Sequence, residues 1–85
     1  MIHFTKHALE KFAILKKHGF IVDRNFVAKT VIEPDMIDYS RSPLKIAQRI
    51  LDRNHVLRVV YKIDSNVIVV ITFYPGRKSQ YENEK

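Results

Sequence analysis

Three turn signals divide the second half of the chain into strand-length runs, and they restrict the fold more than any other feature. The runs are rich in β-branched and aromatic residues and cover residues 36–41, 44–51, 55–63 and 67–74. The dipeptides between them are typical of tight turns and are Ser42-Pro43, Arg53-Asn54 and Ser65-Asn66. Because connections this short join only antiparallel neighbours, the runs predict a four-stranded antiparallel meander.

The residues before these strands have the signals of two helices. Thr5 is expected to cap a first helix, which ends at Gly19. Asp23 is expected to cap a second helix, which ends before Pro34 because a residue preceding proline disfavours the helical conformation. Residues 2–4 would add a short edge strand. The sequence therefore predicts an α+β fold, with two N-terminal helices packed on one face of the sheet.

Length and composition predict one domain without cofactor chemistry. The 85 residues are 46% hydrophobic, enough for a single core, so we expect one domain over residues 1–85 with a polar tail at 79–85 that frays. The chain has no cysteine, which favours a reducing cytoplasm. Its longest apolar run, Val67–Ile71, is too short to cross a membrane. The four histidines are scattered, so we expect neither a metal site nor a cofactor.

The charge of the chain indicates a polyanionic partner. Fifteen Lys/Arg against nine Asp/Glu give a net charge of +6 and a pI near 9.8. Residues 41–62 hold six Lys/Arg and a single Asp. A stretch of this kind is also common on an ordinary solvated surface, so its meaning depends on where the sheet places the side chains.

Strand alternation assigns the side chains to two faces of the predicted sheet. On the third strand, Leu57, Val59, Tyr61 and Ile63 would face the helices, and Arg58 and Lys62 would lie on the open face. On the fourth strand, the wholly apolar set would be the one under the helices, namely Val67, Val69, Ile71 and Phe73.

The turn lengths predict which residues pair across the strands. A three-residue turn over 64–66 would place Arg58 opposite Thr72, and Val56 opposite Tyr74. A tight turn at Arg53-Asn54 would set Arg49 opposite Arg58, and Lys45 opposite Lys62. Four cations would then gather on the open face beside Thr72 and Tyr74, an arrangement that needs an anion between the like charges. A one-residue slip would send Lys45 and Arg49 to the other face.

At this point the residues resemble a known family. The segments that carry the resemblance to the C-terminal half of RelE/ParE-like toxins are residues 57–63, 67–74 and 76–78, with Tyr81. The opening Phe4-Thr5-x-His7-Ala8 is similar to an uncharacterised branch of that superfamily, which is grouped with barnase, EndoU and colicin-type ribonucleases. The resemblance implies a RelE-like fold, RNA as substrate, and an acidic antitoxin protein as partner.

Site residues follow from the resemblance one position at a time. Arg58 matches the family's strand arginine, which contacts the scissile phosphate, and Arg77 or Lys78 matches its second arginine, after the last strand. Tyr81 matches the family's C-terminal tyrosine, and His7 matches the first-helix histidine of the uncharacterised branch. The lysine pair of the RelE active site has no secure counterpart. Lys11 stands where the helix often carries arginine.

These residues suggest metal-independent RNA cleavage, in which the RNA supplies its own 2′-OH nucleophile. His7 and His55 are the candidates for proton transfer, because imidazole titrates near neutral pH. Arg58 and Arg77 would stabilise the phosphoryl charge. The residues expected to bind substrate are Lys45, Arg49, Lys62, Thr72, Tyr74, Lys78 and Tyr81, the tyrosines by stacking on bases.

Each candidate also has an ordinary explanation. His7 in a first helical turn and His55 at a strand entrance are commonly surface or structural residues, Thr72 is a good strand former, and Tyr81 can pin the tail to the sheet. Two further functions therefore stay open. One is a non-catalytic nucleic-acid- or protein-binding module, and the other is ParE-like inhibition of a protein target such as a topoisomerase.

Overall fold

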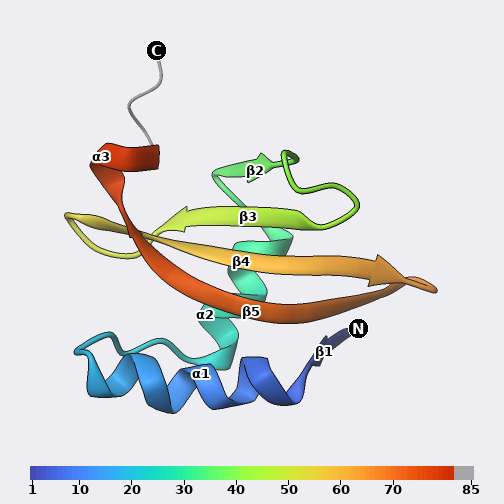
Figure 1. Ribbon diagram of the computed structural model, residues 1–85, viewed down its shortest axis with the longest axis horizontal. Coiled ribbons are helices and arrows are strands. Elements are labelled where there is room, and N and C mark those ends of the chain that lie inside the picture. Colours follow the sequence, from blue (N-terminus) through green and yellow to red (C-terminus); the bar gives the residue numbers. More distant parts are fainter. Residues whose placement is uncertain (82–85) are drawn as a thin grey trace.

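Two helices, five strands and a short third helix make up the fold, which is seen in a computed structural model that describes residues 1–81 (Figure 1). Side chains are described for residues 1–80. In chain order the elements are β1 (Ile2–Phe4), α1 (Lys6–Lys17), α2 (Arg24–Ile32), β2 (Met36–Asp38), β3 (Lys45–Ile50), β4 (His55–Asp64), β5 (Val67–Arg77) and α3 (Lys78–Tyr81).

Both predicted helix caps are confirmed. The hydroxyl of Thr5 accepts a hydrogen bond from the backbone N–H of Ala8 at 3.1 Å, at the start of α1. The carboxylate of Asp23 accepts from the N–H of Phe26 at 2.8 Å, at the start of α2. Each cap satisfies one of the backbone donors that a helix leaves unpaired at its first turn. The helices therefore begin where short-range sequence signals place them.

The end of α1 is a Schellman motif. Gly19 adopts the left-handed conformation, with φ of 88°. Its N–H donates to the carbonyl of Lys16 at 3.1 Å, and the N–H of Phe20 donates to the carbonyl of Leu15 at 2.9 Å. The motif ends the helix, and Phe20, the residue after Gly19, packs against the main hydrophobic cluster.

The sheet has five strands and is mixed, with the order β1-β5-β4-β3-β2. The α+β class is confirmed, but the sheet differs from the predicted four antiparallel strands because β1 joins it parallel to β5. Residues 36–41 form a strand only as far as Asp38, whose carboxylate accepts from the N–H of Ser40 at 2.8 Å and turns the chain away.

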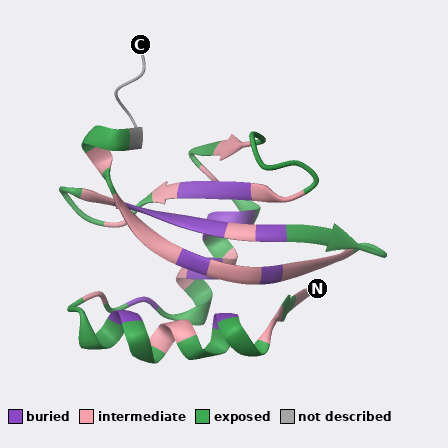
Figure 2. Cartoon of the chain, in the orientation of Figure 1, coloured by how far each residue is buried: buried purple, intermediate pink, exposed green. Residues whose placement is uncertain are grey.

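Two helices cover one face of the sheet, as predicted. In Figure 1, α1 and α2 lie on the same side, with α1 packed on β5 and β1, and α2 packed on β3 and β4. Buried residues concentrate in the middle of β3 and the first part of β4, with Val70 and Phe73 on β5 (Figure 2). Leu57 and Phe73 are wholly buried in this core, and burying each stabilises the fold by roughly 2–3 kcal/mol.

The register of the β4–β5 hairpin differs from the prediction for two reasons. Its turn has two residues, Ser65 and Asn66, which both have positive φ, so Asp64 pairs with Val67. Farther along, a β-bulge leaves Ile71 between the pairs Val60–Thr72 and Tyr61–Val70.

The shifted register changes the partners and the faces. Arg58 therefore lies opposite Tyr74 rather than Thr72, and Val56 lies opposite Gly76. Before the bulge, Val67 and Val69 share the open face with Lys62, while Val70 and Phe73 belong to the core on the helix side. The predicted helix-side set of β5 is therefore wrong for Val67 and Val69 and correct for Phe73. A single bulged residue reverses the alternation that the prediction assumed to be continuous.

The register of β3 against β4 is one residue away from the prediction. Lys45 pairs with Tyr61, and Arg49 pairs with Leu57. The connection is wider than a two-residue turn, because the N–H groups of Leu51 and Asp52 both donate to the carbonyl of His55, at 2.9 and 3.2 Å. Lys45 and Arg49 consequently lie on the face of the sheet that carries the helices.

Candidate functional site

Arg58 lies on the open face as predicted, but its guanidinium is buried and engaged by neighbouring strands. The side chain is 5% exposed. Nη1 donates to Oε1 of Gln48 at 2.6 Å, Nη2 to Oδ2 of Asp38 at 2.8 Å, and Nε to the hydroxyl of Tyr74 at 3.3 Å. This network joins β2, β3, β4 and β5, and the predicted catalytic role of Arg58 stays a prediction.

The carboxylate of Asp38 is strongly held in its charged form. Hydrogen bonds from the backbone and side chain of Ser40, followed by the hydrogen bond from Arg58, lower the pKa of Asp38 to about 2. A charged Asp38 in turn compensates the buried guanidinium.

The predicted four-cation cluster on the open face does not form. Arg49, on the helix side, donates from Nη1 to the carbonyl of Glu33 at 2.6 Å, where it caps the C-terminal end of α2. Lys45 shares that face, and Lys62 is exposed on the open face near the far end of β4. The prediction of the four-cation cluster fails because it depended on the register of β3 against β4, which differs by one residue from the predicted one. The role of each residue in substrate binding stays a prediction.

Two other predicted residues on the open face have structural surroundings. Tyr74 accepts the hydrogen bond from Arg58. Thr72 faces Val60, and its hydroxyl oxygen is buried without a hydrogen-bond partner among the described residues. Tyr81 ends α3, and its side chain lies outside the described residues.

His7 is exposed in the first turn of α1 and is not brought to Arg58. The helix lies on one face of the sheet, and Arg58 belongs to the other. His7 follows Thr5, whose hydroxyl donates to the carbonyl of Ile71. Arg77 comes six residues after Ile71 on β5, so these two residues lie roughly 20 Å apart along the strand, and the start of α1 lies well away from Arg77.

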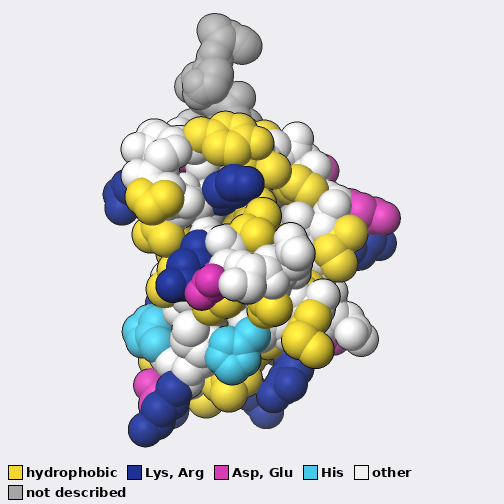
Figure 3. Space-filling view, turned by 90° about the vertical axis from the view of Figure 1, so that its right-hand side faces the viewer, with side chains coloured by type: hydrophobic (Ala, Val, Ile, Leu, Met, Phe, Trp, Pro, Cys, Tyr) yellow, Lys and Arg dark blue, Asp and Glu magenta, His cyan; other side chains and the backbone are white. Residues whose placement is uncertain are grey.

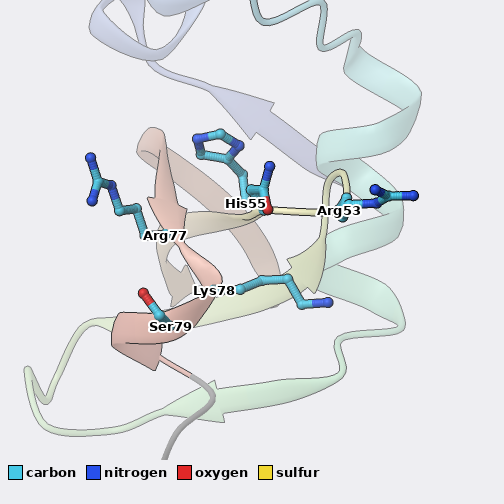
Figure 4. A pocket seen from close by; sticks show the side chains of 6 residues that line it. Arg53, His55, Arg77, Lys78 and Ser79 are labelled. Atoms are coloured by element: carbon cyan, nitrogen blue, oxygen red, sulfur yellow. The ribbon is translucent and has the colours of Figure 1, made fainter.

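The other two predicted catalytic residues, His55 and Arg77, do meet. They are cross-strand partners, at the start of β4 and the end of β5. They contribute to an open hollow of about 540 Å³, which is lined by Arg53, Asn54, His55, Arg77, Lys78 and Ser79 (Figure 4). The start of α3 borders the hollow and is held there by a hydrogen bond from the N–H of Lys78 to the carbonyl of Asn54 at 2.9 Å. We call this the His55 hollow.

A carboxylate orients the imidazole in the His55 hollow. Nδ1 of His55 lies 2.9 Å from Oδ1 and 3.2 Å from Oδ2 of Asp52. The hydrogen bond from His55, followed by that from the N–H of Asn54 at 2.8 Å, lowers the pKa of Asp52. A carboxylate on Nδ1 favours the tautomer with the proton on that atom, which leaves Nε2 able to accept a proton.

The cations of the hollow lie around His55. Figure 4 shows the side chains of Arg77 and Arg53 extending to opposite sides of His55, with Lys78 and Ser79 on α3 below. Asp52 is the acidic group next to the imidazole. On the face shown in Figure 3, Lys and Arg side chains are spread over the surface, some of them beside Asp or Glu side chains, and histidine side chains lie among them. The hollow is thus a place where several cations and a histidine occur together.

Sequence reasoning missed Asp52 as a site residue, used Asn54 only as a turn signal, and used Arg53 only for the turn and for the charge of residues 41–62. Their grouping depends on a local feature, since the Asp52 side chain accepts from the N–H two residues later and the ring three residues later. An aspartate three residues before a histidine at a strand entrance is the signal that indicates this pair.

Comparisons with protein-family models, curated proteins and solved structures found no match. The resemblance to RelE/ParE-like toxins therefore stays a prediction. Within residues 1–81, no helix is long and apolar enough to cross a membrane. No three His, Cys, Asp or Glu side chains gather in this part of the chain in a way that could hold a metal ion.

Proposed function

We propose that this protein is a toxin-like endoribonuclease that cleaves RNA without a metal ion, and that the His55 hollow is its active site. The observation that carries the proposal is the 2.9 Å contact between His55 and Asp52, beside Arg53, Arg77 and Lys78. A carboxylate-oriented imidazole next to several cations matches what phosphodiester cleavage by an internal nucleophile requires.

The proposed reaction uses His55 as a general base. Nε2 takes the proton of a ribose 2′-OH, the 2′ oxygen forms a bond to the adjacent phosphorus, and the bond from phosphorus to the 5′ oxygen breaks. The leaving oxygen takes a proton from water. The products carry a 2′,3′-cyclic phosphate and a 5′-OH. A positioned general base accelerates such a step by about 10²–10⁴-fold.

The placement of the arginines favours a chain of phosphates over a single nucleotide. Because Arg53 and Arg77 extend to opposite sides of His55, they are suited to contact phosphates that flank the scissile one. Arginine binds phosphate through two parallel N–H groups, which also fixes the orientation of the strand. We therefore propose polymeric RNA as the substrate.

A second candidate is nucleic-acid binding without cleavage. His55 is the one histidine that lines the hollow within the described residues, so the hollow has no second imidazole to protonate the leaving oxygen. In this case the cations would bind RNA and the His55–Asp52 pair would only stabilise the turn. Under either function, we propose a cytoplasmic location and an acidic antitoxin partner that covers the same cations.

The test is incubation of the purified protein with single-stranded RNA in EDTA. The proposal expects cleavage, with 2′,3′-cyclic phosphate termini on the products. An otherwise identical strand with a 2′-deoxyribose at each cleavage position should stay intact, because it lacks the nucleophile. Binding of RNA without any cleavage would favour the second candidate, and no binding at all would contradict both.

A further inference from the structure

An aromatic ring contacts the imidazole of His55, in addition to the carboxylate of Asp52. The ring centroids of Phe20 and His55 are 4.9 Å apart, and the two planes meet at 79°. This edge-to-face geometry is a favourable arrangement for aromatic pairs. Phe20 comes from the loop after α1 and is therefore remote in sequence from the hollow.

The backbone of Phe20 is fixed by the end of α1. Its N–H is bound to the carbonyl of Leu15, and the preceding Gly19 has the left-handed conformation that the Schellman motif requires. The ring is partly buried and packs against the main hydrophobic cluster. Phe20 therefore offers His55 a rigid surface.

We propose that Phe20 is a positioning residue for His55, and this inference rests on the proposed function of the His55 hollow. The side chains of His55 and Asp52 are 31% and 49% exposed, so their hydrogen bond does not by itself hold the imidazole, which can rotate out of that contact. The edge-to-face contact with Phe20 removes this freedom, so that Nε2 keeps one direction. The groups around the imidazole are then Asp52 on Nδ1, the Phe20 ring, and the charged side chains of Arg53, Arg77 and Lys78 that line the hollow.

The test compares three variants, of which two lose an aromatic ring at different positions and one keeps it. Phe20→Leu keeps an apolar side chain and removes the ring, and Phe20→Tyr keeps the ring. Phe12→Leu is the matched control, because the ring of Phe12 packs against that of Phe73 in the same core, with 4.8 Å between the ring centroids, and is not the ring that contacts His55. Two quantities are measured for each protein: the tautomer of His55 by ¹⁵N NMR of the imidazole at pH 8, and kcat and KM for RNA cleavage.

The expected result is a selective effect of Phe20→Leu. The wild type, Phe20→Tyr and Phe12→Leu should hold the proton on Nδ1, whereas Phe20→Leu should show a mixture of tautomers. Its kcat should fall by about tenfold, with KM changed less than about twofold, because orientation and not binding is lost. The inference would be overturned if Phe20→Leu kept both the Nδ1–H tautomer and the kcat of the wild type. It would also be overturned if Phe12→Leu lost as much kcat as Phe20→Leu.

The two readouts separate failure of this inference from failure of the proposed function. If the wild type does not cleave RNA, the proposed function is wrong, and the tautomer of His55 in Phe20→Leu still decides whether Phe20 orients the ring. If the wild type cleaves and Phe20→Leu changes the tautomer without changing kcat, Phe20 has no catalytic positioning role.

Discussion

The guanidinium of Arg58 and the carboxylate of Asp38 form an ion pair, with 2.8 Å between Nη2 and Oδ2. The pair joins the middle of β4 to the edge strand β2, and Gln48 on the intervening strand accepts a second hydrogen bond from Arg58. An arginine in an apolar strand thus has a structural explanation in this protein, and the site of the proposed chemistry lies elsewhere.

Removing the side chain of Arg58 is expected to cost stability. Arg58→Ala should lower the free energy of unfolding by roughly 3 kcal/mol, because it leaves the network without its donor and opens a cavity. Urea unfolding followed by circular dichroism measures this change. A loss below about 1 kcal/mol, together with loss of RNA binding, would show that Arg58 acts on substrate instead.

Acid should weaken the Asp38 contribution in a defined pH range. The pKa of Asp38 is about 2 in the folded protein, against 3.8 for the ordinary side chain. Because the folded pKa is the lower one, the stabilisation is present above about pH 4 and is lost as the pH falls toward 2.

The substitution Asp38→Asn measures how much the negative charge of Asp38 contributes to the free energy of unfolding. Its free energy of unfolding should be lower than that of the wild type by on the order of 1 kcal/mol at pH 7, since Asp38 is partly exposed, and the difference should shrink below pH 4. A difference that stays constant from pH 7 to pH 2 would contradict the assignment.

Gly19 is expected to contribute to stability through its backbone conformation alone. A Cβ atom at this position would meet nothing within 4 Å, but φ is 88°. Gly19→Ala should therefore destabilise the protein by about 1 kcal/mol. His18→Ala, one residue earlier and with φ of −95°, is the control and should change the thermal midpoint little. Equal shifts of the thermal midpoint in Gly19→Ala and His18→Ala would argue against backbone strain at position 19 as the cause.

Local signals in the sequence predicted the local parts of this fold. Thr5 and Asp23 cap helices through hydrogen bonds that span three residues, so the sequence nearby is sufficient. The predicted faces of Leu57, Val59 and Arg58 on β4 were also correct, because side chains alternate between the two faces along a continuous strand.

Pairing between strands was not predictable in the same way. The bulge at Ile71 is a property of two strands together, and the residues of β5 before it, Val67 to Val70, are uniformly apolar. The position of Lys45 and Arg49 depended on the width of the turn at 51–54. For the site, His55 and Arg77 were candidates from the sequence and are neighbours, whereas His7 and Arg58 were grouped with them and are not.

Binding of RNA should depend on salt through the cations of the hollow. Arg53→Ala and Arg77→Ala should each weaken binding of a labelled single-stranded RNA and reduce the slope of log K against log salt concentration by about 0.7. Lys45→Ala removes the same charge from β3, away from the hollow, and should leave the slope unchanged. An equal effect of all three substitutions would indicate attraction by net charge alone.

The proposed active site is tested most directly by the cleavage rate of His55→Ala in EDTA, with His7→Ala measured beside it. His55→Ala should cleave RNA about 10²–10⁴-fold more slowly than the wild type, because the general base is gone, and His7→Ala should cleave at the wild-type rate. Wild-type cleavage by His55→Ala, or a loss of activity confined to His7→Ala, would contradict the account.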